Sequence, residues 1–375
     1  ALLVFCVSQV SADDVEIYFN GANAESAPYI HFLVDWRPPV FAGLCTLGTV
    51  AADGSVTGGT CLSSDDPSND PCPSNSVCLS DDILSNLTAA DGLQKGTGDD
   101  VNLFEAFVAI LKAIFEDPRF RTLNVALMSS NDQTSEKWST PNPRTLKTGG
   151  GMFLEGYKSL SIDSERQELI ETLKAIPRNP SSSDAHELQV KESYFEWARY
   201  IKGGQWEHGP AGYDDNYAGD PNAPKHDVST LLAGTYSRNR NNAPDSTDLY
   251  KSPFKSGDCP VLYSVAMMMN SVQSDNNMLD EMNSEWGQSW NNALKIETMW
   301  NYMHASDTDL LPDPNIPGNQ QLAKSWVISE QNAGGNWLGG ESADAAIAGD
   351  SGSPLDLGKP DERFEELEKA FLEIL

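Results

Sequence analysis

Residues 27–39 of this chain read APYIHFLVDWRPP, and this stretch decides the fold. It contains an apolar run that ends in one carboxylate, Asp35, and is followed by an abrupt Pro-Pro stop, which predicts a buried strand. A buried parallel strand whose carboxyl end delivers an Asp to a loop is typical of binding crevices in α/β proteins. The alternative is an ordinary core strand whose Asp35 caps a turn.

The rest of the chain alternates predicted strands with predicted helices. Further strands are predicted at residues 123–128, 152–154, 261–269 and 322–329, and helices at 101–115, 164–176, 184–202, 290–304 and 362–375. The helix at 101–115 has apolar residues at three and four residue steps, with Asp99 and Asp100 at its start and Pro118 after its end. This alternation predicts an α/β fold with a doubly wound, mostly parallel sheet covered on both faces.

Two long polar segments interrupt the alternation, and we interpret them as loop insertions into a single domain. Residues 41–100 are rich in Gly, Ser, Asp and Cys, and residues 205–255 are dense in Asn, Asp, Tyr, Gly and Pro. The first insertion carries Asn86-Leu87-Thr88, a glycosylation sequon that matters only in a eukaryotic host. In the second, Asp214-Asp215-Asn216 and Asp220 offer oxygen ligands for Ca²⁺, but their order does not match an EF-hand. A solvated acidic loop is the favoured interpretation.

Charge and hydropathy limit the partners and the compartment. The formal net charge of −30 argues against nucleic-acid binding and against docking on anionic membranes by charge. Residues 1–12, ALLVFCVSQVSA, resemble the end of a secretory signal peptide, with a short first strand as the alternative. No later segment has the roughly 18 consecutive apolar residues of a membrane span. We therefore expect residues 13–375 to form a secreted or cell-surface domain.

The cysteines favour disulfides over metal binding. Four of the six, Cys45, Cys61, Cys72 and Cys78, lie in the first insertion. In an exported protein this clustering predicts at least one disulfide among them, stapling a loop that has little core of its own. The cluster has no CxxC pair and no neighbouring His, which disfavours a metal site. Cys259 is left either free and buried or paired with a loop cysteine.

A series of landmarks runs in order through nearly the whole chain. They lie at residues 14–19, 29–35, 123–128, 194–203, 252–253, 259, 311–312, 317–318, 333–335 and 367–375. In this order they resemble a von Willebrand factor A domain, and more narrowly the amino-terminal domain of PilY-type type IV pilus tip proteins. The resemblance implies a doubly wound α/β fold whose first strand ends in the metal-binding Asp, which falls on Asp35. It also implies a role in pilus-associated adhesion or assembly.

The metal-ion-dependent adhesion site of that family is incomplete in this chain. The family uses Asp-x-Ser-x-Ser on the first loop, a Thr from a second loop and an Asp from a third, a ligand set that suits Mg²⁺. Here the first motif reads Asp35-Trp36-Arg37-Pro38-Pro39, the Thr position falls near Leu188, and the third position falls on Met269-Asn270. The Arg37 guanidinium beside Asp35 is placed to supply the positive charge of the cation. We therefore predict no metal and no cofactor.

Hydrolytic chemistry is disfavoured by the absence of its motifs. The five histidines, at positions 31, 186, 208, 226 and 304, form no HExxH or HxH pattern, and there is no GxSxG elbow or P-loop. His31 alternates within the first strand and is interpreted as a core or edge histidine. Trp206-Glu207-His208 offers an acid–base pair on proximity alone. The aromatic residues at 197–217 favour a contact surface, with core packing as the alternative.

These observations predict an extracytoplasmic, pilus-associated adhesion or assembly module that is non-enzymatic and binds without the family's metal. Its partners would be pilus or other surface-assembly proteins and a host or surface ligand. The alternatives are a structural or interaction subunit of a surface filament or complex with no adhesive role, and an exported hydrolase, because a fold does not fix a function.

We predict that the binding residues are Asp35, Trp36 and Arg37. The loop ends after Asp35 and Met269 and the helix start near Leu188 should converge, because strand order brings them to one crevice. There Trp36 and Arg37 would offer an aromatic face and a guanidinium to carboxylates, sugars or a partner's loop. The alternative is that Arg37 neutralises Asp35 while Trp36 fills the core.

Overall fold

The fold is described from a computed structural model. It describes residues 27–36, 43–50, 56–69, 73, 76–87, 100–130, 151–176, 190–206, 224, 226–232, 249–255, 260–268, 278–291, 294–303, 323–329, 341–349, 351 and 353–356. Among those residues, no helix combines the length and the apolarity that crossing a membrane requires. The predicted signal segment 1–12 and the predicted helix 362–375 lie outside them.

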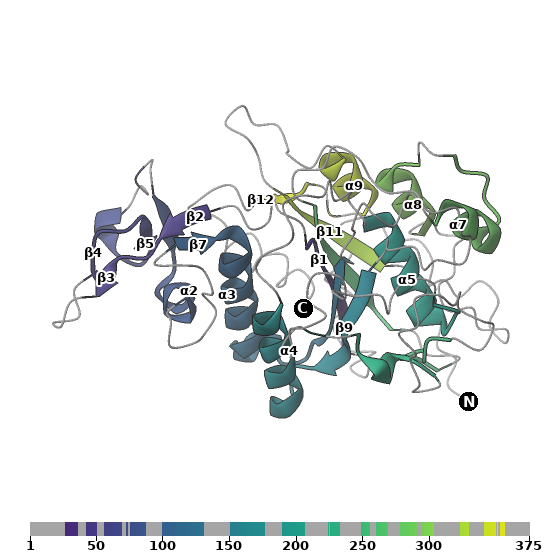
Figure 1. Ribbon diagram of the computed structural model, residues 1–375, viewed down its shortest axis with the longest axis horizontal. Coiled ribbons are helices and arrows are strands. Elements are labelled where there is room, and N and C mark those ends of the chain that lie inside the picture. The colour runs from purple at the N-terminus through teal and green to yellow at the C-terminus, as the bar shows by residue number, and fades with distance from the viewer. Residues whose placement is uncertain are drawn as a thin grey trace, which may run out of the picture.

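A mostly parallel sheet of six strands forms the centre of the described fold (Figure 1). In spatial order the strands are β12 (Leu355–Asp356), β11 (Ala323–Ser329), β10 (Leu262–Met267), β1 (Tyr29–Val34), β8 (Asn124–Ser130) and β9 (Gly151–Ser159). Strand β9 pairs antiparallel with β8, and the other pairs are parallel. The chain fills the sheet from β1 outward in both directions, so the strand order reverses at β1.

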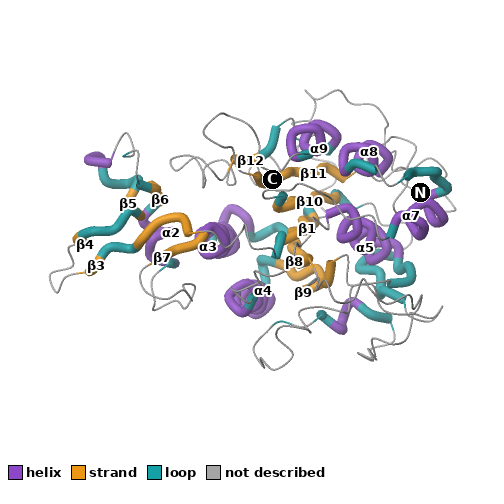
Figure 2. Tube along the Cα trace, turned by 45° about the horizontal axis from the view of Figure 1, so that its top comes forward, coloured by secondary structure: helices purple, strands orange, loops and turns teal. Residues whose placement is uncertain are grey.

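Helices cover both faces of this sheet (Figure 2). Side chains alternate along β1, so Ile30, Phe32 and Val34 pack on one side and Leu33 packs on the other. The first side is covered by α3 (Leu103–Glu116) and α4 (Asp163–Ala175). The second side is covered by α5 (Val190–Lys202), α7 (Leu279–Trp286), α8 (Ile296–Met303) and α9 (Ser342–Ala348). We call these the α3 face and the α5 face.

The predicted α/β class with a mostly parallel sheet is confirmed. The strands predicted at 27–35, 123–128, 261–269 and 322–329 correspond to β1, β8, β10 and β11. The edge strand predicted at 152–154 is longer, because β9 extends along all of β8. Helices α3, α4, α5 and α8 were predicted with shifted ends, whereas the short α7, α9 and β12 were not predicted.

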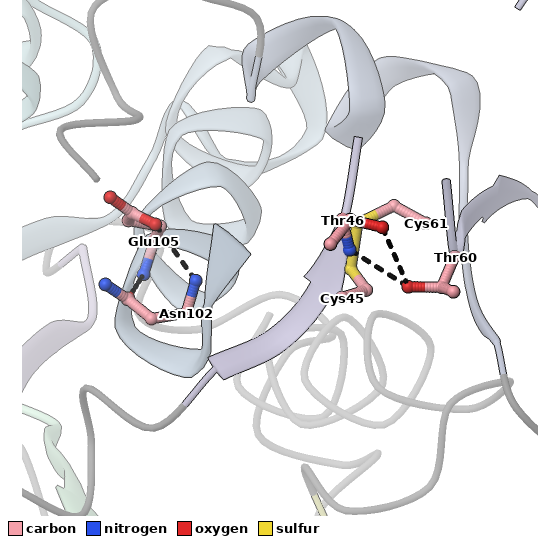
Figure 3. Close-up of a disulfide and its surroundings, with 6 residues drawn as sticks. All are labelled: Cys45, Thr46, Thr60, Cys61, Asn102 and Glu105. Atoms are coloured by element: carbon pink, nitrogen blue, oxygen red, sulfur yellow. Dashed lines mark hydrogen bonds between the residues drawn. A yellow bond between two sulfur atoms is a disulfide. The ribbon is translucent and has the colours of Figure 1, made fainter. Parts of the chain in front are cut away.

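Helix α3 begins with a cap at Asn102 that was not predicted from the sequence. The Asn102 side chain accepts a hydrogen bond from the Glu105 N–H at 2.8 Å, and the Glu105 carboxylate accepts one from the Asn102 N–H at 2.9 Å (Figure 3). This capping box satisfies two N–H groups at the helix start. Asp100 instead belongs to β7 (Asp100–Asn102), and Asp99 lies outside the described residues.

The first insertion forms small sheets beside α3 (Figure 1). Strand β2 (Gly43–Thr46) pairs with β7, and β3 (Thr49–Val50) pairs with β4 (Val56–Thr57), both antiparallel. Strand β5 (Cys61–Ser63) pairs parallel with β6 (Val77–Leu79), and the helix α2 (Asp81–Asn86) follows. The described residues of the insertion therefore form regular secondary structure and not an extended loop.

A disulfide joins Cys45 of β2 to Cys61 of β5, which confirms the prediction of a bridge in this cluster (Figure 3). Cys78 is also disulfide-bonded, while Cys72 and Cys259 lie outside the described residues. The described residues of the insertion form no separate core of their own. Its buried apolar side chains continue the core of the α3 face: Cys45, Cys61, Val77, Leu79, Ile83 and Leu87.

Candidate functional site

The carboxyl ends of the parallel strands meet at one edge of the sheet, which we call the carboxyl edge. Asp35 and Trp36 follow β1, Ser130 ends β8, Met268 follows β10, and Ser329 ends β11. Because β1 pairs in parallel with both β8 and β10, the topology brings these residues to the same end of adjacent strands. In open α/β sheets, ligands bind in the crevice outside this edge, where the strand order reverses.

Trp36 anchors the loop after β1 to the neighbouring strand. Its backbone N–H donates to Ser130 Oγ at 2.9 Å, and its side chain is 0% exposed within the core of the α3 face. The alternation of β1 explains this burial, since Trp36 continues the series Ile30, Phe32 and Val34. Its indole is therefore not presented to solvent in this conformation, and Trp36 acts on a site here only by holding the loop.

Asp35 is the first residue after β1 and is 2% exposed. Of the two charged residues among the predicted binding residues, only Asp35 lies in the described part of the chain. Arg37, the intended counter-ion, lies outside the described residues, as do Leu188, Met269 and Asn270. Whether these positions form a binding site therefore stays a prediction.

The first turn of α5 reaches the same edge. Gly151, which pairs with Ser130, is packed so closely on this turn that an added Cβ would lie 2.6 Å from Ser193 Oγ. Only a residue without a side chain allows this approach of β9 to the helix. The described residues Asp35 and Met268 and the start of α5 thus gather at one end of the sheet, as the strand order requires.

At the carboxyl ends of β10 and β11, the carboxyl edge carries serine hydroxyl groups that are hydrogen-bonded. Ser329 Oγ donates to the Met268 carbonyl oxygen at 3.0 Å, and Ser342 Oγ at the start of α9 donates to Ser329 Oγ at 3.1 Å. Together with Ser130 they line the strand ends with neutral donors and acceptors. Within the described part of the chain, no three His, Cys, Asp or Glu residues group closely enough to hold a metal ion.

A second polar cluster lies deeper, between β1 and α5. His31 Nδ1 is 3.2 Å from Ser264 Oγ, to which the Tyr194 hydroxyl also donates. The imidazole stacks on Trp197, with ring centroids 5.0 Å apart and planes 9° apart. Burial lowers the pKa of His31 to about 3, so the ring is neutral near pH 7. His31 is a core residue, as predicted, although its Nε2 has no hydrogen-bond partner among the described residues.

Residues 190–201 of helix α5 are all buried, including the charged ones. The burial of these charged side chains was not predicted from the sequence. Lys191 Nζ donates to the Leu294 carbonyl oxygen, and Arg199 Nε donates to a carboxylate oxygen of Glu285 at 2.8 Å. A buried charge is tolerated when it is paired and hydrogen-bonded. These contacts bind α5 to the segments around α7 and α8.

The two acids of α5 are held in the same manner. Glu192 accepts a hydrogen bond from the Met278 N–H at 3.1 Å, and the Tyr250 hydroxyl donates to Glu196 at 2.7 Å. Burial and the Glu196 carboxylate raise the pKa of Tyr250 well above its ordinary value. The burial of these two acids could not be predicted from the sequence of α5 alone, because their hydrogen-bond partners, Met278 and Tyr250, come from distant segments.

The described part of the second insertion packs on α5. Trp206 and Tyr250 are buried with Trp197 and Tyr200 in the core of the α5 face. Core packing is thus the interpretation that holds for Trp197, Tyr200 and Trp206, and the predicted contact surface was wrong for these three residues. Glu207, His208 and the acidic positions 214–216 and 220 lie outside the described residues.

No family model, curated protein or solved structure matches this chain. The resemblance to the von Willebrand factor A domain and to PilY-type proteins therefore stays a prediction from the order of the landmarks. The fold itself is a mixed α/β fold with a mostly parallel central sheet. Any functional conclusion has to start from the carboxyl edge.

Proposed function

We propose that this chain is an extracytoplasmic, non-enzymatic module of pilus-associated adhesion or assembly, with a doubly wound domain of the von Willebrand factor A type. It binds a partner at the carboxyl edge without a metal ion. The observation that carries the proposal is the position of Asp35. It directly follows β1, the strand at which the sheet order reverses, and the neighbouring strand ends bear hydroxyl groups.

The arrangement of the sheet supports the fold part of this proposal. The resemblance implies a doubly wound sheet, and β1 lies between β8 and β10, where the strand order reverses. Helices on both faces are what a doubly wound sheet needs to bury its strands. The Cys45–Cys61 disulfide supports export, because such bonds persist mainly in oxidising compartments.

The site proposed here uses Arg37 in place of a cation. In the proposed site, the guanidinium of Arg37 would neutralise the charge of Asp35 and still offer donors to a partner's carboxylate or sugar hydroxyl groups. Trp36 contributes by fixing the loop through its backbone bond to Ser130. The buried pair of His31 and Ser264 lies beneath α5 and serves the packing of that helix.

Independence from metal is tested by thermal melting. We expect millimolar Mg²⁺ or Mn²⁺ to leave Tm unchanged, because a site filled at 100 times its dissociation constant would add about 2.7 kcal/mol of stability. A rise of several degrees that Asp35→Ala abolishes would contradict the proposal.

The function is tested in the native host with a deletion strain complemented by variants. We expect the deletion to reduce surface piliation or attachment, and chelators not to reproduce the loss. Arg37→Ala should fail to restore attachment, whereas Arg119→Ala should restore it. Arg119 is a matched control, because it lies in η4 (Pro118–Phe120), before β8 and at the opposite edge of the sheet, where it pairs with Asp117.

The outcomes separate the proposed roles. Normal pili and normal attachment in the deletion strain would reject the pilus proposal. Fewer pili with normal attachment by the remaining ones would favour the second candidate, a structural subunit with no adhesive role. Trp36→Ala is expected to destabilise the domain, because its side chain is fully buried, so it does not report on binding.

A further inference from the structure

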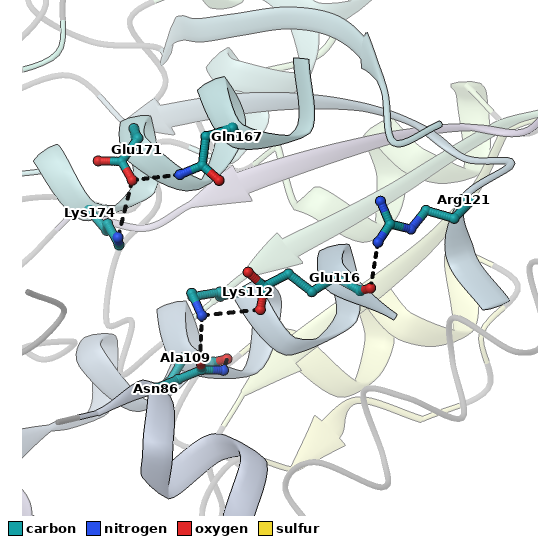
Figure 4. Close-up of polar contacts among 8 residues, drawn as sticks. All are labelled: Asn86, Ala109, Lys112, Glu116, Arg121, Gln167, Glu171 and Lys174. Atoms are coloured by element: carbon teal, nitrogen blue, oxygen red, sulfur yellow. Dashed lines mark hydrogen bonds and ion pairs between the residues drawn. The ribbon is translucent and has the colours of Figure 1, made fainter. Parts of the chain in front are cut away.

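The sequon Asn86-Leu87-Thr88 begins at a residue whose side chain is part of the fold. Asn86 is the last residue of α2 and is 6% exposed. Its Nδ2 donates to the Ala109 carbonyl oxygen of α3 at 3.3 Å, and its Oδ1 accepts from Lys112 Nζ at 2.5 Å (Figure 4). One carboxamide thus joins the insertion to two successive turns of α3.

Buried apolar side chains flank this contact on α2. Ile83 and Leu87 flank Asn86 on α2 and are fully buried in the core of the α3 face. Lys112 is held in place from a second side, because its Nζ also pairs with the Glu116 carboxylate at 3.1 Å (Figure 4). The carboxamide of Asn86 therefore has fixed partners for both its donor and its acceptor.

We propose that Asn86 is a structural latch, and that attachment of a glycan at Asn86 and docking of α2 on α3 are mutually exclusive. N-glycosylation forms a bond from the anomeric carbon of an oligosaccharide to Nδ2. A proton leaves Nδ2, and the lipid diphosphate carrier leaves the sugar. The bulky product belongs on an exposed surface. At Asn86 the modified nitrogen faces α3, so the sugar ring would occupy the space that Ala109 and Lys112 fill.

The backbone conformation points the same way. Asn86 lies in a helix, and Leu87 continues it in the right-handed helical region, with φ −81° and ψ −10°. Asn86 and Leu87 are thus helical and buried, not extended and presented to an enzyme. A chain that received a glycan before folding would have to leave α2 undocked, exposing Ile83 and Leu87 together with the side of α3 that α2 covers.

The experiment uses the full chain secreted from a eukaryotic cell that glycosylates sequons. Three proteins are compared: the wild type, Thr88→Ala and Asn86→Gln. Thr88→Ala destroys the sequon but keeps the carboxamide of Asn86. Asn86→Gln also destroys the sequon and moves the amide outward by one methylene. Each protein is treated with an endoglycosidase, and each secreted monomer is melted and analysed by hydrogen exchange.

We expect the folded, secreted wild type to show no change of mass on deglycosylation. Any glycosylated wild type should be retained or aggregated, while Thr88→Ala is secreted. Asn86→Gln should lower Tm by about 2 °C or more relative to Thr88→Ala, with faster exchange in α2, because its partners on α3 lose their hydrogen bonds. A glycan on natively folded wild type, or equal Tm and exchange for the two variants, would overturn the proposal.

Discussion

The two faces of the central sheet differ in the polarity of the side chains that pack on them. On the α3 face, apolar side chains of β1, β8, β10 and β11 meet the apolar surfaces of α3 and α4. On the α5 face, the sheet presents polar residues, including Ser264 and Ser325, among its apolar ones to a helix with large aromatic side chains. The first face is held mainly by apolar packing, with a hydrogen bond from Thr172 of α4 to Glu155 of β9. The second face combines apolar packing with a network of several hydrogen bonds.

This difference shows how one strand can serve two purposes. Phe32 of β1 packs with Phe115 of α3, at a centroid distance of 6.3 Å, and needs no polar partner. His31, the preceding residue, depends on Ser264 and on the stacked ring of Trp197. Apolar contacts tolerate substitutions of similar volume, whereas a buried polar group is costly as soon as one partner is removed.

The largest expected effect tests the volume of the α3 face. Phe115→Ala should lower the free energy of unfolding by about 3–5 kcal/mol, because a fully buried phenyl ring leaves a cavity. Chemical denaturation measures the loss, and Phe115→Leu, which keeps most of the volume, should cost less than about 2 kcal/mol. Equal losses for the two variants would show that shape and not volume governs this face.

The disulfide tests whether the insertion belongs to the α3 face. Replacing Cys45 and Cys61 together by Ser should cost about 3 kcal/mol, as expected for a closed loop with a sequence separation of 16 residues. Hydrogen exchange should accelerate first in α2 and α3, whose cores are continuous with the bridge. Equal acceleration in α5 would mean that the two faces unfold as one unit.

Tyr194→Phe tests the hydrogen-bond network of the α5 face at nearly constant volume. It should cost about 1–3 kcal/mol, because the hydroxyl bonds to Ser264 and Ser325 are lost while the serines stay buried. Tyr263→Phe on the α3 face is the control. The hydroxyl of Tyr263 has no hydrogen bond in the described part of the chain, so we expect a change within about 0.5 kcal/mol. Similar losses at both positions would contradict the difference between the faces.

Acid should act on the α5 face through His31. Burial lowers its pKa to about 3 in the folded state, from 6.5, so the unfolded state binds the extra proton. This contribution to stability is complete above pH 6.5 and is lost as the pH falls toward 3, by at most about 1.4 kcal/mol per pH unit. Unfolding curves between pH 7 and 5 measure it, with His31→Phe as the comparison. A slope that is the same in the variant would assign the acid sensitivity to other groups.

The parts of the fold that follow from local periodicity could be predicted from the sequence. The apolar run of β1 and the helical repeat of α3 gave the right elements, and their alternation gave the α/β class. The short α7 and α9 were not predicted, because helices of eight and seven residues give a weak periodic signal; α8, with eight residues, was predicted only as part of the longer segment 290–304. The cap at Asn102 was missed because acidic residues just before it gave a competing signal for the same helix start.

The candidate site was harder to predict than the fold. The position of Asp35 follows from strand order, but the burial of Trp36 required knowing which face it continues. The charged residues of α5 read as a solvated helix surface, and only distant partners such as Leu294 and Glu285 make their burial tolerable. Long-range pairing of this kind leaves no trace in local sequence.

The central position of β1 also means that, during synthesis, one of its two neighbouring strands is made much later than β1 itself. His31 meets Ser264 across the β1–β10 pair over a sequence separation of 233 residues. At ribosomal rates of about 5–20 residues per second, β10 is made roughly 12–47 s after β1. During that interval β1 has β8 on one edge at most, and its other edge is an unpaired apolar strand of the kind that recruits other chains. The cell therefore has to shield this strand, by a chaperone or by delayed folding, until the second half of the sheet arrives.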